Sequence, residues 1–306
     1  MSGASTSGEN RAAYFIDGER FPAAALEPGL YVVATPIGNL ADVTLRGLAT
    51  FAAADLIACE DTRVTRVLLD RYGIHTPLIP YHDHNAAGQR PKLLSALAEG
   101  KAVALCSDAG TPLVSDPGYR LAVDAAAAGH KVVPVPGASA LLAALAGAGL
   151  PTDTFLFAGF LPPKETARRK RLAELAAVPA TLIFYEAPQR LGAALADMAD
   201  VLGGKRGAAI GRELTKRFEE FVRGDLTELA ARYGKGEAPK GEIVVLIGPP
   251  VVRTQDPEDV DTLLRELLGK GSVREAADAA ADLTGLSRRD LYQRALKLKD
   301  GNGGRD

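Results

Sequence analysis

Short apolar runs alternate along residues 30–151 with longer segments in which apolar residues recur every three to four positions. Such runs are typical of buried strands, and the longer segments have the period of helices. Strands are predicted at 30–34, 56–60, 77–81, 102–108 and 131–136. Helices are predicted at 44–53, 62–71, 89–99 and 119–128, with a further one after Pro136. Because strands that alternate with helices are joined by crossover connections, this pattern predicts a largely parallel sheet covered by helices on both faces.

A second pattern of strands and helices begins after segment 147–151, whose glycine and proline residues predict a domain boundary. Its strands are predicted at 154–160, 180–185, 208–212, 218–223 and 243–248. Its helices are predicted at 165–177, 189–202 and 226–233. The third and fourth of these strands follow one another without a helix, so this sheet is predicted to be mixed. The predicted fold class is therefore α/β, with two α/β domains at 29–150 and 151–250.

Both ends of the chain are predicted to lie outside these domains. Residues 1–28 begin with the polar segment MSGASTSGEN and are predicted to form a disordered tail. Pro249, Pro250 and the polar stretch after them predict a linker. A small helical module is predicted at 258–300, with helices at 260–268, 272–283 and 287–298. Two of these short helices are joined by a turn that contains glycine, which resembles a helix-turn-helix.

Composition and charge indicate a globular protein without a global charge bias. The 306 residues are 47% hydrophobic and 24% charged, which excludes global disorder. The 36 Lys and Arg residues against 38 Asp and Glu residues give a net charge of −2, so any RNA contact requires local patches. No apolar run reaches the roughly 18 residues that span a membrane. Two cysteines, Cys59 and Cys106, do not make a disulfide framework, so a cytoplasmic location is expected.

Segment 107–118, SDAGTPLVSDPG, is the strongest candidate for a ligand site because it follows an apolar strand. In open α/β sheets, ligands bind beyond the carboxyl ends of the strands. Small residues allow a ligand to approach the backbone, and exposed N–H groups can hold a carboxylate. Asp108 and Asp116 would repel a triphosphate but suit an ammonium, a sulfonium or ribose hydroxyls. The alternative is a capped structural turn, because Asp, Gly, Pro and Ser are common turn residues.

Two further loops rich in small residues leave strands of the same predicted sheet. They are 35–40, TPIGNL, and 136–140, PGASA. Each loop alone fits a tight turn or a ligand wall. Because the carboxyl ends of parallel strands meet at one edge of a sheet, the three loops together predict a single site.

Other familiar sites are not indicated. Segment 269–272 lacks the Walker spacing, and 137–141 lacks the closing glycine of a nucleophile elbow, which argues against an NTPase and a serine hydrolase. The HDHN segment at 82–85 has two imidazoles, and no further Cys or His cluster completes a four-ligand site. A loop that faces substrate is therefore favoured there over a metal site, and no metal is expected.

Charged residues gather where predicted strands end. EDTR at 60–63 can cap the next helix or face substrate, and RELTK at 212–216 and KGE at 240–242 can orient a polar substrate or remain solvated. The basic run at 164–171 is either a solvated helix face or a patch that contacts phosphate. The last helical segment is also basic, which favours RNA docking, with helical packing or dimerisation as the alternative.

Six segments resemble motifs of the ribosomal RNA small subunit methyltransferase I family, within the tetrapyrrole-methylase-like class of S-adenosylmethionine enzymes. They are TPIGNL, EDTR, HDHN, SDAGTPLVSDPG, RELTK and KGE, in this order along residues 30–248, and the helical tail is similar too. The resemblance implies a two-domain α/β homodimer that uses S-adenosylmethionine for 2′-O-methylation of a cytidine in the decoding region of 16S rRNA. Its implied partner is 16S rRNA or the small ribosomal subunit, with no membrane.

The same resemblance implies which residues line the S-adenosylmethionine site. By motif they are Pro36, Ile37, Asp108, Gly110, Thr111, Val114, Ser115, Asp116, Gly137, Ala138, Ser139, Tyr185 and Glu242. The candidate RNA contacts are Arg63, Arg168, Arg169, Lys170, Arg171, Arg288, Arg289 and Arg294. The segment at 137–139 departs from the glycine-proline-cysteine of some relatives.

The family reaction is an in-line displacement in which a ribose oxygen attacks the methyl carbon of a sulfonium. A ribose hydroxyl is a poor nucleophile at neutral pH, so a general base or a cation should assist. The sequence does not rank the candidates, which are Glu60, Asp61, His82, Glu213 and Lys216. Two other functions stay open at this point: a small-molecule tetrapyrrole methylase of the precorrin type, and a non-catalytic RNA-binding or ribosome-assembly factor.

Overall fold

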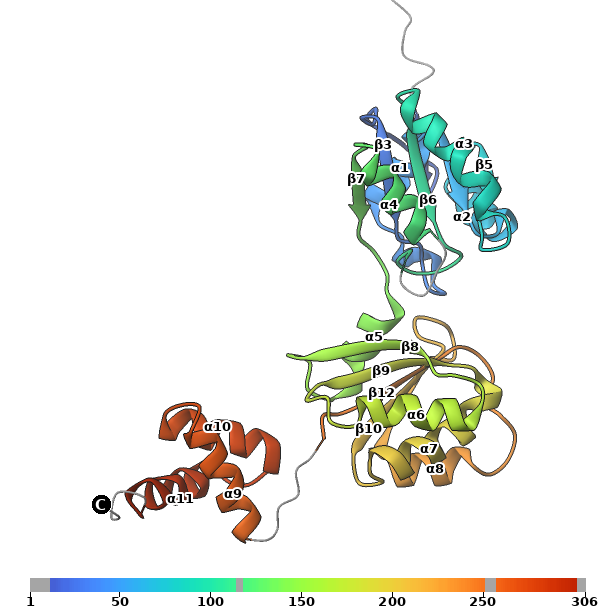
Figure 1. Cartoon of the computed structure of the whole chain (residues 1–306). Coiled ribbons are helices and arrows are strands. Elements are labelled where there is room, and N and C mark those ends of the chain that lie inside the picture. The colour runs from blue at the N-terminus through green and yellow to red at the C-terminus, as the bar shows by residue number, and fades with distance from the viewer. Residues whose placement is uncertain (1–11, 114–117, 251–256, 302–306) are drawn as a thin grey trace, which may run out of the picture. The chain divides into compact units, whose positions relative to one another are not determined.

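The computed structural model describes residues 12–113, 118–250 and 257–301 (Figure 1). The chain divides into two compact units, which are described separately. The first comprises the chain up to Ala148 together with Ile210–Phe221 and Gly241–Val244. The second comprises Gly149–Ala209, Val222–Lys240 and the chain from Val245 onward.

A five-stranded sheet forms the centre of the first unit. Its strands lie in the order β5 (Leu78–Pro80), β4 (Leu56–Cys59), β6 (Ala102–Cys106), β3 (Gly29–Val33) and β7 (Val132–Val135). The neighbouring strands are parallel, with Cys59 opposite Cys106 and Val32 opposite Leu105. All residues of β3 and β6 are buried, as expected for central strands of a parallel sheet with both faces covered.

Helices cover both faces of this sheet. Two apolar clusters lie between the sheet and these helices. To one cluster, α1 (Leu45–Ala53) contributes Phe51 and α2 (Thr62–Arg71) contributes Leu69. The other cluster takes Leu93 from α3 (Ala86–Ala98) and Leu121 from α4 (Tyr119–Ala127). A fifth helix, α5 (Ala140–Ala148), follows β7. The prediction of a parallel sheet between two helical layers is therefore confirmed.

Residues 13–22 correct the expectation that residues 1–28 form a disordered tail. They form an antiparallel hairpin of β1 (Ala13–Ile16) and β2 (Glu19–Pro22). Asp17 and Gly18 have φ angles of 50° and 86°, which gives the two-residue turn that matches the twist of paired strands. Tyr14 stacks on Phe21 with ring centroids 5.6 Å apart and is buried in the core of the first unit. The hairpin is ordered because Tyr14 is buried in this core and the partly buried Phe21 packs against it; residues 1–11 lie outside the described residues.

The second five-stranded sheet is mixed, as predicted. Its strands lie in the order β11 (Glu220–Asp225), β10 (Gly207–Arg212), β12 (Ile243–Ile247), β9 (Thr181–Glu186) and β8 (Phe155–Phe160). Strands β8 and β9 are parallel, whereas β10 is followed by β11 without an intervening helix. Three helices accompany the sheet in the sequence: α6 (Glu165–Leu175), α7 (Leu191–Leu202) and α8 (Leu226–Tyr233).

The C-terminal region forms a module of three helices. They are α9 (Pro257–Leu268), α10 (Val273–Thr284) and α11 (Arg288–Gly301). Ser272 and Glu275 form a reciprocal capping box at the start of α10, and Gly285 ends that helix in the left-handed conformation with φ 70°. Leu264 and Leu291 belong to a small apolar core of the module. None of the helices in the described part of the chain combines the length and apolar character needed to span a bilayer.

Candidate active site

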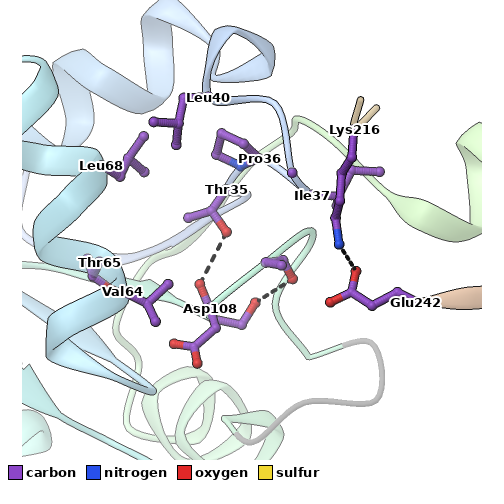
Figure 2. Close-up of a pocket in the computed structure, with 13 residues that line it drawn as sticks. Thr35, Pro36, Ile37, Leu40, Val64, Thr65, Leu68, Asp108, Lys216 and Glu242 are labelled. Carbon is purple, nitrogen blue, oxygen red and sulfur yellow. Dashed lines mark hydrogen bonds and ion pairs between the residues drawn. The ribbon is translucent and has the colours of Figure 1, made fainter. Parts of the chain in front are cut away.

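A pocket of about 230 Å³ opens in the first unit, beyond the carboxyl ends of β3 and β6 (Figure 2). Its walls come from the loop after β3, the start of α2, the loop after β6 and two charged residues of the motifs RELTK and KGE. Figure 2 shows Leu40 and Leu68 on one side of the pocket and Lys216 with Glu242 on the other. The pocket thus combines an apolar wall with a charged one.

Hydrogen bonds join the loop after β3 to the loop after β6. The backbone N–H of Thr35 donates to the carbonyl of Gly110 at 2.9 Å, and the N–H of Gly110 donates back to Thr35 at 3.0 Å. The Thr35 hydroxyl donates to the Ser107 carbonyl at 3.1 Å. Gly110 has a φ of 81°, and a Cβ there would lie 3.3 Å from Ile37.

The loop after β7 joins the same edge of the sheet. The Thr111 hydroxyl donates to the carbonyl of Ala138 at 3.1 Å. A Cβ at Gly137 would lie 3.0 Å from the Ala34 side chain, so glycine permits the close approach of this loop to the end of β3. The prediction that three small-residue loops meet at one edge is therefore confirmed. Ser139 is the last residue of this loop before α5. Val114, Ser115 and Asp116, in the loop after β6, lie outside the described residues.

Two adjacent carboxylates, Glu60 and Asp61, have opposite environments at the end of β4. Burial raises the pKa of the Glu60 carboxyl, and the nearby Asp108 charge raises it further. Hydrogen bonds from Arg63 lower the pKa of Asp61 to about 2. The Asp61 N–H also donates to the Asp108 carboxylate at 2.8 Å, which ties this turn to the pocket. A raised pKa suits a proton acceptor, whereas Asp61 is committed to Arg63.

Lys216 lies between two carboxylates at the charged wall. Its Nζ is 2.9 Å from Glu213 Oε1 and 3.1 Å from Glu242 Oε2. Burial acts to lower the pKa of Lys216, but these hydrogen bonds outweigh it and the pKa is raised. The hydrogen bond from Lys216 lowers the pKa of Glu213. Glu213 is therefore held in the ionised form beside an ammonium.

The loop that carries these charges has an unusual backbone. Glu213 and Thr215 have φ angles of 50° and 65°, in the left-handed region that non-glycine residues rarely adopt. Reciprocal bonds hold the turn: Glu213 N–H donates to the Glu242 carbonyl at 2.9 Å, and Glu242 N–H donates to Glu213 Oε1 at 3.0 Å. In the loop after β3, glycine at position 38 leaves room for the Lys216 side chain, which lies where a Cβ atom would be. Backbone strain held by surrounding contacts is common at functional sites.

Ten of the described catalytic and cofactor-site candidates do not line this pocket: Glu60, Asp61, His82, Gly110, Thr111, Gly137, Ala138, Ser139, Tyr185 and Glu213. His82 lies in the loop after β5, where its backbone N–H donates to Asn85 Oδ1 at 2.9 Å. Tyr185 lies on β9 in the second unit, and its ring meets those of Phe157 and Phe160 edge to face, with centroids 4.8 and 5.6 Å away. The pocket also contains Val64, Thr65 and Leu68 of α2, for which the sequence predicts no role. Val64 is 45% exposed, but a lone apolar residue on a helix gives no functional signal in the sequence.

The basic run on α6 differs from the expectation of an RNA-contacting patch. The Arg168 side chain is 7% exposed, and its Nε lies 2.6 Å from Asp197 on α7. Arg169 lies 2.8 Å from Asp197 and 3.2 Å from Asp200, while the exposed Arg171 pairs with Glu174. Lys170 is exposed. The structure therefore contradicts an RNA contact by Arg168, because its charge is buried in an ion pair that joins two helices.

A groove of about 410 Å³ lies between α10 and α11 of the helical module. Arg274, Arg289 and Tyr292 line it, and the Tyr292 side chain is partly exposed at 39%. Arg288 also lines the groove but pairs with Asp282 at 3.0 Å. Arg294 pairs instead with Asp261 of α9 within the module, so it is not available at the groove. Arg63, at the first unit, has a side chain that is 89% exposed.

Two family models match this chain. The model for Tetrapyrrole (Corrin/Porphyrin) Methylases matches residues 29–230. The model for the RsmI C-terminal HTH domain matches residues 254–299. Together they cover most of both α/β regions and the helical module.

Two curated relatives carry the name ribosomal RNA small subunit methyltransferase I. The protein of Mesorhizobium japonicum is 58% identical over 282 residues, which are 92% of this chain and 96% of the relative. The protein of Pseudomonas aeruginosa is 46% identical over 276 residues, 88% of this chain and 96% of the relative.

Solved structures show the fold. The cobalt precorrin-4 methyltransferase of cobalamin biosynthesis is 18% identical with a TM-score of 0.54, over 72% of this chain and 94% of that one. A diphthine synthase is 16% identical with a TM-score of 0.56, over 72% of this chain and 89% of that one. At this identity the likeness concerns the fold alone.

Proposed function

The chain belongs to the tetrapyrrole (corrin/porphyrin) methylase family and, within it, to the ribosomal RNA small subunit methyltransferase I proteins. From this membership we propose that it uses S-adenosylmethionine to methylate the 2′-oxygen of a cytidine ribose in the decoding region of 16S rRNA. The observation that carries the proposal is that the likeness runs through the pocket loops and the helical module alike. Small-molecule tetrapyrrole methylases share the fold at much lower identity, so that alternative is disfavoured.

The pocket residues suit S-adenosylmethionine. The carboxylates of Asp108 and Glu242 suit its ammonium, its sulfonium or its ribose hydroxyls, and Ile37 and Leu68 offer apolar surface for a ring. When bound, the cofactor supplies a methyl group carried by a sulfonium sulfur, and this sulfur becomes a neutral thioether once the methyl group is transferred. The proposed contacts are Pro36, Ile37, Asp108, Gly110, Thr111, Gly137, Ala138, Ser139 and Glu242, with Val114, Ser115 and Asp116 in the segment outside the described residues.

We assign the general base to Glu60. Its partly buried carboxyl has a raised pKa, whereas Asp61 and Glu213 are held ionised by Arg63 and Lys216. The proton of the ribose hydroxyl passes to the Glu60 carboxylate as the oxygen forms its new bond to carbon. A carboxylate with a raised pKa is a stronger base than one that a cation stabilises. Lys216 and the exposed Arg63 then orient the ribose–phosphate backbone.

The helical module contacts RNA through the groove between α10 and α11. Arg274 and Arg289 make no ion pair with another described residue, so their charges are available to phosphate. Tyr292, partly exposed between them, offers a ring on which a base can stack. We also propose a cytoplasmic homodimer, which the family resemblance implies and which light scattering of the purified protein would test.

Methyl transfer from labelled S-adenosylmethionine tests the function. The protein is expected to label 16S rRNA, presented either naked or in small ribosomal subunits, at one 2′-O-methylcytidine in the decoding region. Label on a base, or on a tetrapyrrole but not on RNA, would refute the proposal. A calorimetric titration without a saturable S-adenosylmethionine site would favour the non-catalytic RNA-binding factor instead.

Substitution of Tyr292 by alanine is expected to weaken RNA binding. Loss of one stacked base costs about 1–3 kcal/mol, so the Kd for RNA should rise about 5- to 150-fold. Arg289→Gln should reduce the slope of log K against log salt by about 0.7, the value for one phosphate contact on a single strand. Fluorescence anisotropy at several salt concentrations measures both. Lys270→Gln, on an exposed turn of the same module away from the groove, is the control, and equal effects of all three variants would contradict the groove assignment.

A further inference from the structure

Asn85 clamps the loop that follows β5. Its Oδ1 accepts a hydrogen bond from the backbone N–H of His82 at 2.9 Å, and its Nδ2 donates to the carbonyl of Pro80 at 3.0 Å. If the amide were reversed, its nitrogen would face an N–H and its oxygen would face a carbonyl. The two backbone partners therefore fix which end of the amide is the nitrogen.

This orientation also fixes the proton on the His82 ring. Asn85 Nδ2 lies 3.1 Å from Nε2 of His82. An amide nitrogen has only protons to offer, so Nε2 must be the acceptor. A neutral imidazole that accepts at Nε2 carries its own proton on Nδ1. Asn85 thus selects the Nδ1–H tautomer of His82.

The Nδ1 atom of His82 is buried and has no hydrogen-bond partner within the described part of the chain. Buried donors in folded proteins are nearly always paired, so an acceptor is expected in the functional state. Glu60 is placed to be that acceptor: β4 and β5 are neighbours with Cys59 opposite Pro80, so Glu60 and the His82 loop leave the same edge of the sheet side by side. The two side chains are also near enough for a positive charge on His82 to lower the pKa of Glu60, against the opposing effects of burial and Asp108.

We propose that Asn85 and His82 are positioning residues for Glu60: Asn85 holds His82 in the Nδ1–H tautomer, and Nδ1–H donates to the Glu60 carboxylate when RNA is bound. The proposal rests on the function given above, in which Glu60 receives the ribose proton. A base that is itself oriented by a second group recurs in enzyme active sites. Such hydrogen bonds are often long in the free enzyme and tighten in the complex with substrate.

The tautomer is tested directly by long-range ¹H–¹⁵N correlation spectra of the full-length protein. The spectrum of His82 is expected to show a protonated Nδ1 and an acceptor Nε2. Assignment uses His82→Gln, which should remove this signal, and His75→Gln, which should leave it unchanged because His75 is exposed and outside the site. A proton on Nε2 in the wild-type protein would overturn the proposal, whatever the activity of any variant.

Asn85→Asp separates the positioning role from a purely structural one. The carboxylate keeps the acceptor for the His82 N–H but presents an oxygen to Nε2, so the ring proton should move to Nε2. We expect kcat for methyl transfer to fall on the order of 10²-fold, as misplaced catalytic groups do, with KM for RNA and Kd for S-adenosylmethionine unchanged. Wild-type kcat with an inverted tautomer would overturn the role.

His82→Asn gives a second, independent measurement. The short amide of the introduced asparagine places a donor close to the position of Nδ1, whereas the longer amide of the glutamine in His82→Gln reaches toward the position of Nε2. The Asn variant should therefore retain about tenfold more kcat than the Gln variant, and the reverse order would overturn the proposal. A wild-type protein that fails to methylate rRNA but shows the Nδ1–H tautomer would refute the proposed function and leave the tautomer assignment intact.

Discussion

Glu60→Gln is expected to lower kcat for rRNA methylation about 10²- to 10⁴-fold, the contribution of a general base. Glutamine keeps the size of the side chain and an acceptor oxygen but does not take up the ribose proton. Glu60 does not line the cofactor pocket, so the Kd for S-adenosylmethionine should stay at the wild-type value. Single-turnover methyl transfer and calorimetric titration measure the two quantities separately.

The pH dependence of kcat tests independently whether Glu60 is the general base. Burial and Asp108 raise the pKa of the Glu60 carboxyl above its ordinary value of 4.5. The base is active only when deprotonated, so wild-type kcat should fall as the pH drops through an apparent pKa above 4.5. Glu60→Gln should abolish this limb, while Glu99→Gln, at an exposed helix end, should leave both rate and profile unchanged. A larger loss for Asp61→Asn than for Glu60→Gln would contradict the assignment.

Asp197→Ala is expected to lower the free energy of unfolding by about 3–5 kcal/mol, because it leaves the charge of Arg168 buried without its partner. The Arg168 and Asp197 side chains are 7% and 8% exposed, and their nearest atoms are 2.6 Å apart. For a region of this size the loss corresponds to a decrease in Tm of about 6–20 °C. Thermal and guanidinium unfolding of the full chain, followed by circular dichroism, measure it.

Asp200→Ala is the matched control for this ion pair. Asp200 contacts Arg169 at 3.2 Å but its side chain is 69% exposed, so its loss should cost about 0–1 kcal/mol. Replacing both buried partners, Arg168→Met with Asp197→Leu, should recover most of the stability because no unpaired charge remains in the interior. Equal destabilisation by Asp197→Ala and Asp200→Ala would show that burial of Arg168 does not govern the effect.

Local patterns in the sequence predicted the elements of the fold well. The apolar runs at 30–34 and 102–108 became the two buried central strands β3 and β6, and the loops after them meet at the pocket. The hairpin at residues 13–22 has such a pattern too, although it lies in the segment predicted to be a disordered tail. Its Asp17-Gly18 turn, between alternating apolar residues, is a strong hairpin signal, but the polar residues before it suggested a tail.

Environment distinguishes residues that the sequence presents as equals. Glu60 and Asp61 are neighbouring carboxylates, but only one side chain meets Arg63, and their pKa values move in opposite directions. Arg168 and Lys170 lie in one basic run, but the helical turn directs the first toward Asp197, 29 residues away, and leaves the second exposed. No pattern within either segment contains this information.

The sequence by itself determined the strands, the helices, their crossover order and the small-residue loops, because periodicity and turn chemistry act over a few residues. The tertiary structure alone decided which charges are buried, which are paired and which remain available. Lys216 pairs with Glu242, 26 residues away in the sequence. Thr35, after β3, forms hydrogen bonds with Gly110, after the neighbouring strand β6. Burial and ion pairing depend on distances between segments that only the packed chain brings together, and these distances set the chemistry of the site.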